Sequence, residues 1–196
     1  ELPEFRYRIS GYADVGPGFP MCWQKKDFVP SELSSVGIVL TRLVTKVVLS
    51  VDSGDTGLEV SYVAIRQAPL SVAPFALSGS MAEYNGVSDG DMASSADITS
   101  LNNGGTAEFY VLENMQGRFS EEDIHSDKEK VLPTHDPRYR TCSYIEISMQ
   151  YVSQKMYSKR DLIYRFYLGE GRNDLDVERN CHYRIIVCPE GDGLGD

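Results

Sequence analysis

The sequence has few of the residues that build catalytic or metal centres. It contains three histidines and four cysteines in 196 residues. None of the cysteines lies in a Cys-x-x-Cys pair, so the pattern does not indicate a zinc ribbon. The histidines are scattered, and nothing in the sequence predicts a Ser-His-Asp or Cys-His site. They are His125, His135 and His182.

The cysteines favour small buried apolar positions over disulfides, although their redox state stays open. They are Cys22, Cys142, Cys181 and Cys188. The odd separation of Cys181 and Cys188 along one expected strand points them to opposite faces, so we do not expect them to bond to each other.

Long apolar runs and excess positive charge are also missing. No run approaches the ~20 residues of a membrane-spanning helix. The chain opens with "ELPEFRYRIS", which is not a signal peptide, and export stays open. The net charge of −10 argues against binding to a phosphate backbone and favours a role of the acidic residues in solubility.

The dominant positive signal is an alternation of apolar and polar residues with period two. This pattern predicts strands with one buried and one solvent-facing side, which pair in antiparallel fashion. Two such sheets must cover each other, so we predict an all-β fold built of antiparallel β-sandwiches. The alternating runs are 5–9, 36–40, 43–51, 58–65, 108–112, 145–151, 162–168 and 181–187.

Turn residues and composition suggest the organisation of these strands. "DSGDTG" at 52–57 predicts a β-hairpin over 43–65. The segment between the two strand-rich halves is rich in Ser, Gly and Asn and too long for a simple turn. We therefore expect an N-terminal sandwich domain over 1–78, a linker or long loop over 79–105, and a C-terminal sandwich domain over 106–196.

Two other segments carry residues that could do chemistry, and each has a simpler interpretation. Asp174, Asp176 and Glu178 alternate as calcium ligands can, but the segment lacks the Gly and Glu of an EF-hand loop, so a solvated turn is favoured. "DPRYRTC" and "FRYR" interleave arginine with tyrosine, as in binding sites for single strands or glycans. Packing of long side chains along a sandwich face is favoured for both. "SEEDIHSDKEK" at 120–130 predicts a short helical turn or a loop.

Three phrases together resemble the C-terminal domain of the fimbrillin-like proteins of Bacteroidetes, the subunits of type V pili. They are "EFYVLENMQG", "TCSYIEISMQYV" and "IYRFYLGEGRNDLDVERNCHYRIIV". "VGIVLTRLVTKVVLSV" and "SYVAIRQAP" resemble the end of that family's N-terminal domain. The resemblance covers about 36–77 and 106–191.

The resemblance implies two transthyretin-like sandwich domains, of which the N-terminal one here looks incomplete. It also implies export as a lipoprotein, location at the outer membrane or cell surface, and assembly into fimbriae by exchange of a β-strand between subunits. The lipid anchor is not part of this sequence. The resemblance also implies that a protease can remove an N-terminal strand. Arg42 is the kind of residue that an arginine-specific protease would cut, but it lies within an apolar run, where a structural role is favoured.

The functional prediction is therefore a structural or adhesive pilus subunit, without enzymatic activity, cofactor or metal. Its expected partners are other pilus subunits, with a host glycan or protein as a further candidate. The alternative is a surface lipoprotein acting as a glycan- or protein-binding module through exposed aromatic residues such as Trp23, Tyr139 and Tyr144. A calcium-assisted hydrolase is the least favoured class.

Overall fold

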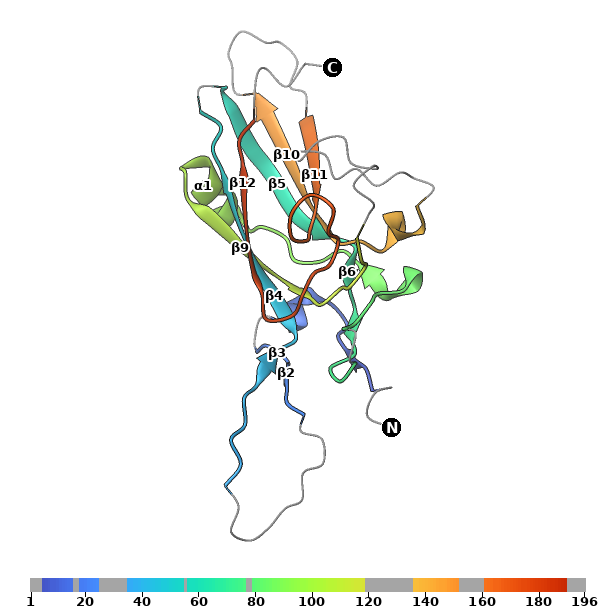
Figure 1. Ribbon diagram of the computed structural model, residues 1–196. Coiled ribbons are helices and arrows are strands. Elements are labelled where there is room, and N and C mark those ends of the chain that lie inside the picture. The colour runs from blue at the N-terminus through green and yellow to red at the C-terminus, as the bar shows by residue number, and fades with distance from the viewer. Residues whose placement is uncertain are drawn as a thin grey trace.

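The chain folds into β-strands with one short α-helix (Figure 1). The computed structural model describes residues 5–15, 18–24, 35–54, 56–76, 79–118, 136–151 and 161–189. The helix is α1 (Ser95–Asn102), and no described helix has the length and apolarity needed to cross a membrane. The strands are β1 (Tyr7–Arg8), β2 (Met21–Cys22), β3 (Thr41–Arg42), β4 (Val44–Val51), β5 (Leu58–Arg66), β6 (Ala68–Pro69), β7 (Ser71–Val72), β8 (Val87–Ser88), β9 (Thr106–Leu112), β10 (Tyr144–Tyr151), β11 (Asp161–Tyr167) and β12 (His182–Val187).

The six long strands form two three-stranded sheets that pack face to face. One sheet has the order β12-β4-β9 and the other has the order β11-β10-β5. The inward side chains of both sheets belong to one apolar core. Most of the alternating runs form the long strands that the sequence predicted, although consecutive residues such as Val47, Val48 and Leu49 are also buried in the central strand β4. Fully buried examples are Val47, Leu49, Val63, Ile65, Phe109, Ile145 and Ile147.

The predicted hairpin over 43–65 is wrong. β4 and β5 are consecutive strands, but β4 pairs with β9 and β12 while β5 pairs with β10. Both edges of β4 are therefore occupied, and the chain crosses from one sheet to the other after β4. The residues at 52–57 still suit the connection between β4 and β5, because Gly54 and Gly57 adopt positive φ angles of 48° and 70°.

The pairing within the β12-β4-β9 sheet also differs from an all-antiparallel arrangement. β12 runs parallel to β4, with His182 opposite Lys46 and Val187 opposite Val51. The other long pairs, β4 with β9, β10 with β11 and β10 with β5, are antiparallel. A parallel pair needs a long connection, and the entire stretch between the two strands supplies it.

The expected domains at 1–78 and 106–196 are not separate in the described residues. β4 and β5, from the first range, are paired with β9, β10 and β12 from the second. Sequence composition suggested a boundary because the intervening segment is polar, but hydrogen bonding across the sheets corrects that expectation. The described residues instead form one sandwich with small peripheral sheets.

The expected linker over 79–105 contains ordered structure that covers the core. Ser94 and Asp97 form a capping box at the start of α1, in which each side chain accepts from the other's backbone N–H. Leu101 of α1 is buried in the core. Small polar residues in this segment therefore serve helix capping and close packing rather than flexibility.

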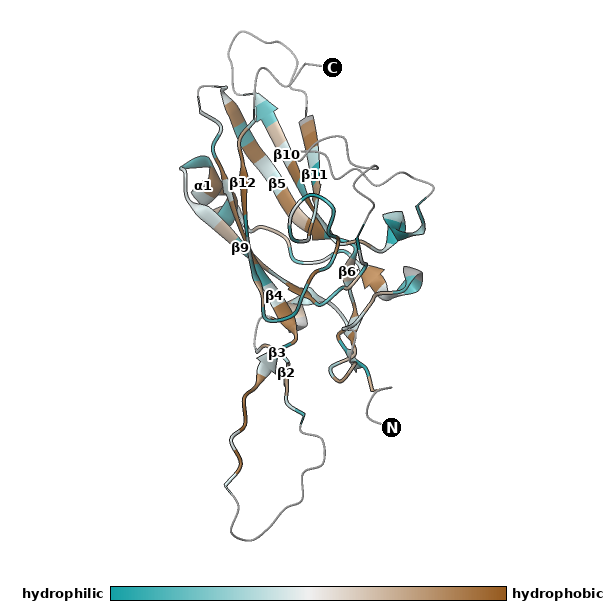
Figure 2. Ribbon diagram, viewed as in Figure 1, coloured by the Kyte–Doolittle hydropathy of each residue, from teal (hydrophilic) through white to brown (hydrophobic). Residues whose placement is uncertain are grey.

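The alternating run at 36–40 does not form a strand. Residues 35–40 are extended and lead into β3, outside the sandwich. Ile38, Val39 and Leu40 are 59%, 78% and 57% exposed, and Figure 2 shows this segment as an apolar stretch away from the core. Alternation alone predicted a buried face, but no sheet of the described residues lies beside this segment to bury it.

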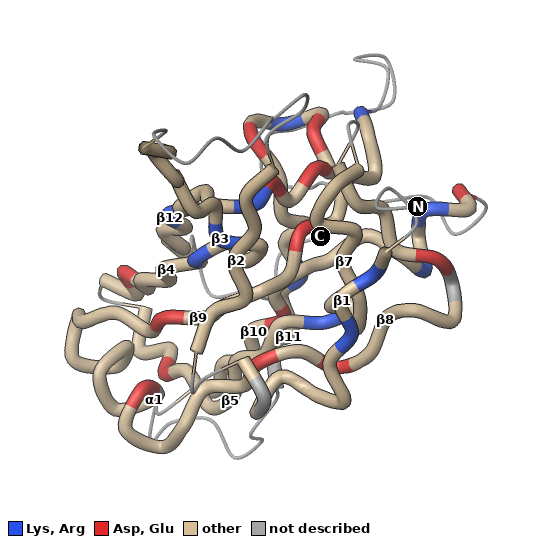
Figure 3. Tube along the Cα trace, turned by 90° about the horizontal axis from the view of Figure 1, so that it is seen from below, with Lys and Arg blue, Asp and Glu red and all other residues tan. Residues whose placement is uncertain are grey.

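Charges of both signs are interspersed over the surface. Seen from below in Figure 3, basic and acidic positions lie near one another around the fold. Lys46 and Glu108, for example, pair across β4 and β9 at 2.7 Å.

We expect the two halves to be unable to fold separately. Fragments 1–78 and 79–196 each lack strands that the other's sheets need, so each should lose the cooperative urea transition of the full chain. Mixing the two fragments should restore it in part. Circular dichroism during urea titration measures this, and a cooperative transition in isolated 79–196 would contradict the single sandwich.

Candidate functional site

One side of the sandwich is left incompletely covered by the described residues. Inward residues of the edge strands β11 and β12 pack against the core but remain half-buried, whereas those of the central strands are fully buried. They are Leu162, Tyr164 and Phe166 on β11, and Tyr183 and Ile185 on β12. An edge with half-exposed inward side chains presents apolar surface that an additional strand would bury.

The opposite side of the sandwich is closed. Helix α1 packs against β9, β5 and β4, so β9 and β5 lie on the same side (Figure 1). Asn102 of α1 accepts from the Val60 N–H at 2.7 Å and donates to the Val60 carbonyl at 2.9 Å. Further along β5, Ile65 donates to Asp91 O at 2.8 Å. The β5 edge is thus protected from other strands, and β11 and β12 lie on the unprotected side.

The backbone of β12 has polar groups directed away from β4. Cys181 and Val187 carbonyls accept from the Lys46 and Asp52 N–H groups at 3.1 and 2.8 Å. In a parallel ladder, alternate residues bond to the same neighbour. The N–H and C=O groups of His182, Arg184 and Ile186 therefore face the outer edge, where no strand of the described residues pairs with them.

A buried ion pair holds together the loops at one end of the sandwich. Arg179 donates to Glu113, with Nε at 2.7 Å from Oε1 and Nη2 in close contact with Oε2. The same guanidinium donates to the carbonyls of Pro74 at 2.8 Å and Ala73 at 3.0 Å. Hydrogen bonds with Glu113 raise the pKa of Arg179, although burial opposes this. Three distant segments are fixed by this one contact.

The phrase "ENMQG" that follows β9 also supplies a buried amide network. The Asn114 side chain accepts from the Ala82 N–H at 3.1 Å and donates to Thr141 O at 2.7 Å. It also accepts from Gln116 Nε2 at 2.7 Å. These residues end β9, as the sequence predicted, but they are buried, because their polar groups bond to distant loops.

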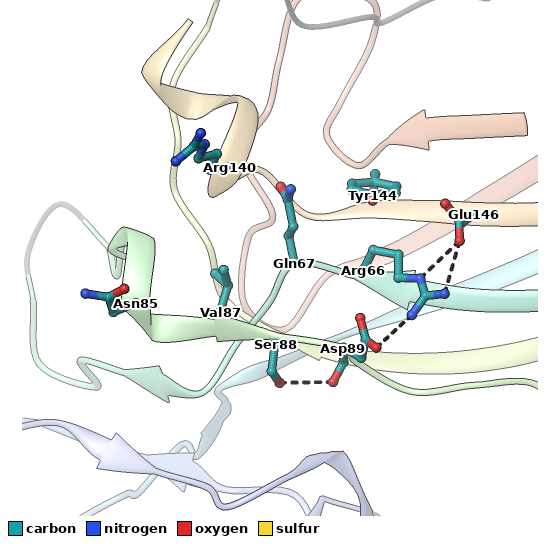
Figure 4. Close-up of a pocket in the computed structure, with 9 residues that line it drawn as sticks. All are labelled: Arg66, Gln67, Asn85, Val87, Ser88, Asp89, Arg140, Tyr144 and Glu146. Carbon is teal, nitrogen blue, oxygen red and sulfur yellow. Dashed lines mark hydrogen bonds and ion pairs between the residues drawn. The ribbon is translucent and has the colours of Figure 1, made fainter. Parts of the chain in front are cut away.

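An open hollow of about 780 Å³ lies beside β5 and β10 (Figure 4). Arg66 occupies its wall, with Nε and Nη2 both 3.1 Å from Glu146 Oε1 and Nη1 2.8 Å from Asp89 Oδ2. Burial lowers the pKa of Arg66, but the hydrogen bonds to Asp89 and Glu146 outweigh it and raise the pKa. The lining residues are Arg66, Gln67, Asn85, Val87, Ser88, Asp89, Arg140, Tyr144 and Glu146.

Tyr144 and Gln67 give the hollow a fixed shape. The Tyr144 ring lies 5.4 Å from the Tyr167 ring and 5.8 Å from the Arg165 guanidinium. Burial raises the pKa of Tyr144, while Arg165 lowers it, so the hydroxyl keeps its proton at neutral pH. Gln67 adopts a φ of 51°, an uncommon conformation for a residue other than glycine.

The aromatic residues singled out in the sequence are only partly brought together. Tyr144 lines the hollow, and the Tyr139 carbonyl accepts from Gln67 Nε2 at 3.1 Å. Trp23 follows β2 and does not line the hollow. "DPRYR" contains a 3₁₀ helix at Pro137–Arg140 rather than a strand, and it places Arg140 in the hollow. Sequence reasoning missed Arg66, Asp89 and Glu146, whose meeting depends on strand register.

The other candidates bind protein groups or lie elsewhere. Asp174 accepts from Arg118 at 3.0 Å, and Asp176 accepts from the Gly117 N–H at 2.6 Å, so these carboxylates fix a turn. His182 is exposed on β12, and Arg42 is exposed on β3. His125, His135 and the stretch 120–130 lie outside the described residues. Among the described residues, no group of three His, Cys, Asp or Glu side chains could hold a metal ion.

All four cysteines are free thiols. Cys142 is buried beside Leu175, whereas Cys188 is exposed. Burial raises the pKa of Cys142 to about 12, despite the opposing effect of Arg138. The prediction of a small buried apolar position is therefore confirmed for Cys142 and wrong for Cys188.

The chain has distant similarities to known proteins. A model of a domain of unknown function (DUF4906) matches residues 109–187. A candidate cell adhesion protein from Parabacteroides distasonis is 17% identical, with a TM-score of 0.47 over 77% of this chain and 45% of its own. The tip fimbrial protein Mfa3 from Porphyromonas gingivalis, truncated at its C-terminus, is 12% identical, with a TM-score of 0.42 over 78% and 49%. No curated protein matches the chain in sequence.

The chain spans about half the length of these two solved structures. Both similarities are structural and distant.

Replacing Glu113 with Gln should lower the free energy of unfolding by about 2 kcal/mol, because the largely covered Arg179 guanidinium would lose its counter-charge. Urea denaturation at neutral pH measures this. Lys46→Gln breaks an exposed pair and serves as the control, with no measurable change expected. Equal stability of Glu113→Gln and the natural sequence would show that the buried pair is dispensable.

Cys188 should react with a thiol reagent in the folded protein at pH 8, whereas Cys142 should react only after denaturation. Burial and a pKa near 12 both keep the Cys142 thiolate scarce. Mass spectrometry of peptides labelled with iodoacetamide, with and without urea, distinguishes the two sites. Rapid native labelling of Cys142 would contradict its burial.

Proposed function

We propose that the chain is a structural or adhesive subunit of a bacterial cell-surface fimbria of the type V kind. Subunits join by exchange of a β-strand, which adds to the β11–β12 side of the sandwich. The observation that carries this proposal is the half-buried state of the inward side chains of β11 and β12, on the side that α1 does not cover. The transthyretin-like topology implied by the sequence resemblance is part of the proposal.

Strand addition would pair the outer backbone groups of β12 and bury its half-exposed apolar side chains. Backbone groups of His182, Arg184 and Ile186 would gain a ladder partner, and the partner's alternate side chains would cover Tyr183 and Ile185. Completing the burial of a half-exposed large side chain contributes about 1 kcal/mol. The main-chain bonds supply affinity, and the apolar side chains select the register of the added strand.

Further parts of the proposal concern location and partners. The fimbria would stand on the outer membrane or cell surface, held there by a lipid anchor. Its partners would be other pilus subunits, and it would have no enzymatic activity and need no cofactor or metal. The contacts of Arg66, Glu113 and Arg179 hold loops and strands in position, as expected of a structural subunit.

Arg184→Pro should prevent assembly and leave the fold intact. Proline removes an N–H that faces the outer edge of β12 and does not take part in the ladder with β4. Arg184→Ala is the matched control, since it removes the same charge and keeps the N–H. Electron microscopy and gel migration without boiling measure the assemblies, and circular dichroism checks the fold.

Assembly by the natural sequence and by Arg184→Ala, but not by Arg184→Pro, supports the proposal. If the natural sequence stays monomeric both before and after proteolytic processing, the fimbrial proposal fails. If Arg184→Pro assembles as the natural sequence does, the β12 edge is not the site of addition.

A further inference from the structure

We propose that the hollow beside β5 and β10 binds a neutral, hydroxyl-rich ligand, the terminal sugar units of a glycan. This site is distinct from the β11–β12 edge and its use goes beyond assembly. It lies where the end of β5, the start of β10, β8 and the 3₁₀ helix at Pro137–Arg140 meet (Figure 4). Its volume of about 780 Å³ is in the range of small-ligand sites.

Arg66 and the two carboxylates that line the hollow already form ion pairs. Arg66 bridges Glu146 and Asp89, at 3.1 and 2.8 Å, and Arg165 donates to the other oxygen of Glu146 at 2.9 Å. An anionic ligand would have to displace a carboxylate from Arg66, and a cationic ligand would have to displace Arg66. A neutral ligand can add hydrogen bonds to these groups without breaking an ion pair.

The lining groups suit vicinal hydroxyls, each of which donates and accepts. Carboxylates of Asp89 and Glu146 offer acceptors, and Asn85 offers both an acceptor and donors. The protonated hydroxyl of Tyr144 is a further donor, and its ring supplies an apolar face with a polar tip. A sugar, with hydroxyls on its rim and apolar C–H groups on its face, matches both kinds of surface.

The backbone around the hollow is already paired, and this disfavours an extended peptide. At the end of β5, Arg66 is opposite Tyr144 of β10 on one side. On the other side Gly90 donates to the Ile65 carbonyl at 2.9 Å. A peptide strand would find no open β5 edge here. Recognition must therefore use side chains, as it does for a glycan.

The wall of the hollow is fixed before any ligand arrives. Gln67 keeps its left-handed backbone because Ser143 Oγ donates to its carbonyl at 2.9 Å, while its own Nε2 donates to Tyr139 O at 3.1 Å. A backbone held in a sparsely populated conformation is common at binding sites. A rigid wall lowers the entropy lost on binding.

Binding to a printed array of neutral and sialylated oligosaccharides, with extended peptides alongside, tests the proposal on the full chain. We expect neutral oligosaccharides to bind, Tyr144→Leu to weaken binding about tenfold and Asn85→Ala about fivefold. Matched controls are Tyr110→Leu, a half-buried tyrosine on β9, and Asn103→Ala, an exposed asparagine after α1. Both should bind as the natural sequence does.

Failure of the natural sequence to bind any neutral oligosaccharide would overturn the proposal. So would binding to sialylated sugars or peptides alone, or unchanged binding by Asn85→Ala and Tyr144→Leu. Thermal unfolding shows whether Tyr144→Leu is folded. If Tyr144→Leu is unfolded, Asn85→Ala still tests the proposal, because Asn85 is exposed and its replacement should leave the fold intact. Assembly measured on the same preparations separates loss of glycan binding from loss of strand exchange.

Discussion

The contact between the apolar faces of β4 and β10 is the constraint on which the rest of the structure depends. Each is the central strand of its sheet, and Leu49 and Ile147 are among the side chains buried in the common core. Once these faces meet, β9, β5, β11 and β12 are the outer strands of the two sheets. Helix α1 covers the side formed by β9 and β5. The side formed by β11 and β12 is therefore the one that remains accessible to another strand. In an asymmetric sandwich of this kind, one side is covered against strand addition and the other side is open to it.

The strands could be predicted from the sequence, whereas their partners could not. Alternation in runs such as 145–151 reports which residues reach a core, and that is a local property. The turn at 52–57 suits a hairpin and a crossing between sheets equally well, because Gly54 and Gly57 permit both. Alternation at 36–40 predicted a strand, but alternation cannot show whether a neighbouring strand is present. Pairing depends on contacts between residues far apart in the chain.

The candidate sites show the same division. Tyr139 and Tyr144 were recognisable as aromatic residues in polar surroundings, and both lie at or beside the hollow. The Arg66–Glu146 pair arises from the register of β5 against β10, which no short motif encodes. Likewise, Glu113 and Asn114 read as the end of a strand, which they are. Their burial depends on Arg179 and on loops that only the folded chain brings near.

The parallel pairing of β12 with β4 has a consequence for how the molecule reaches its native state. During synthesis, β4 and β5 emerge long before the strands that flank them. Their apolar side chains stay exposed to solvent until β9, β10 and finally β12 have been synthesised. Folds dominated by contacts between residues far apart in the sequence form slowly and pass through aggregation-prone intermediates. The sandwich should therefore be completed only when the last strand, β12, docks beside β4.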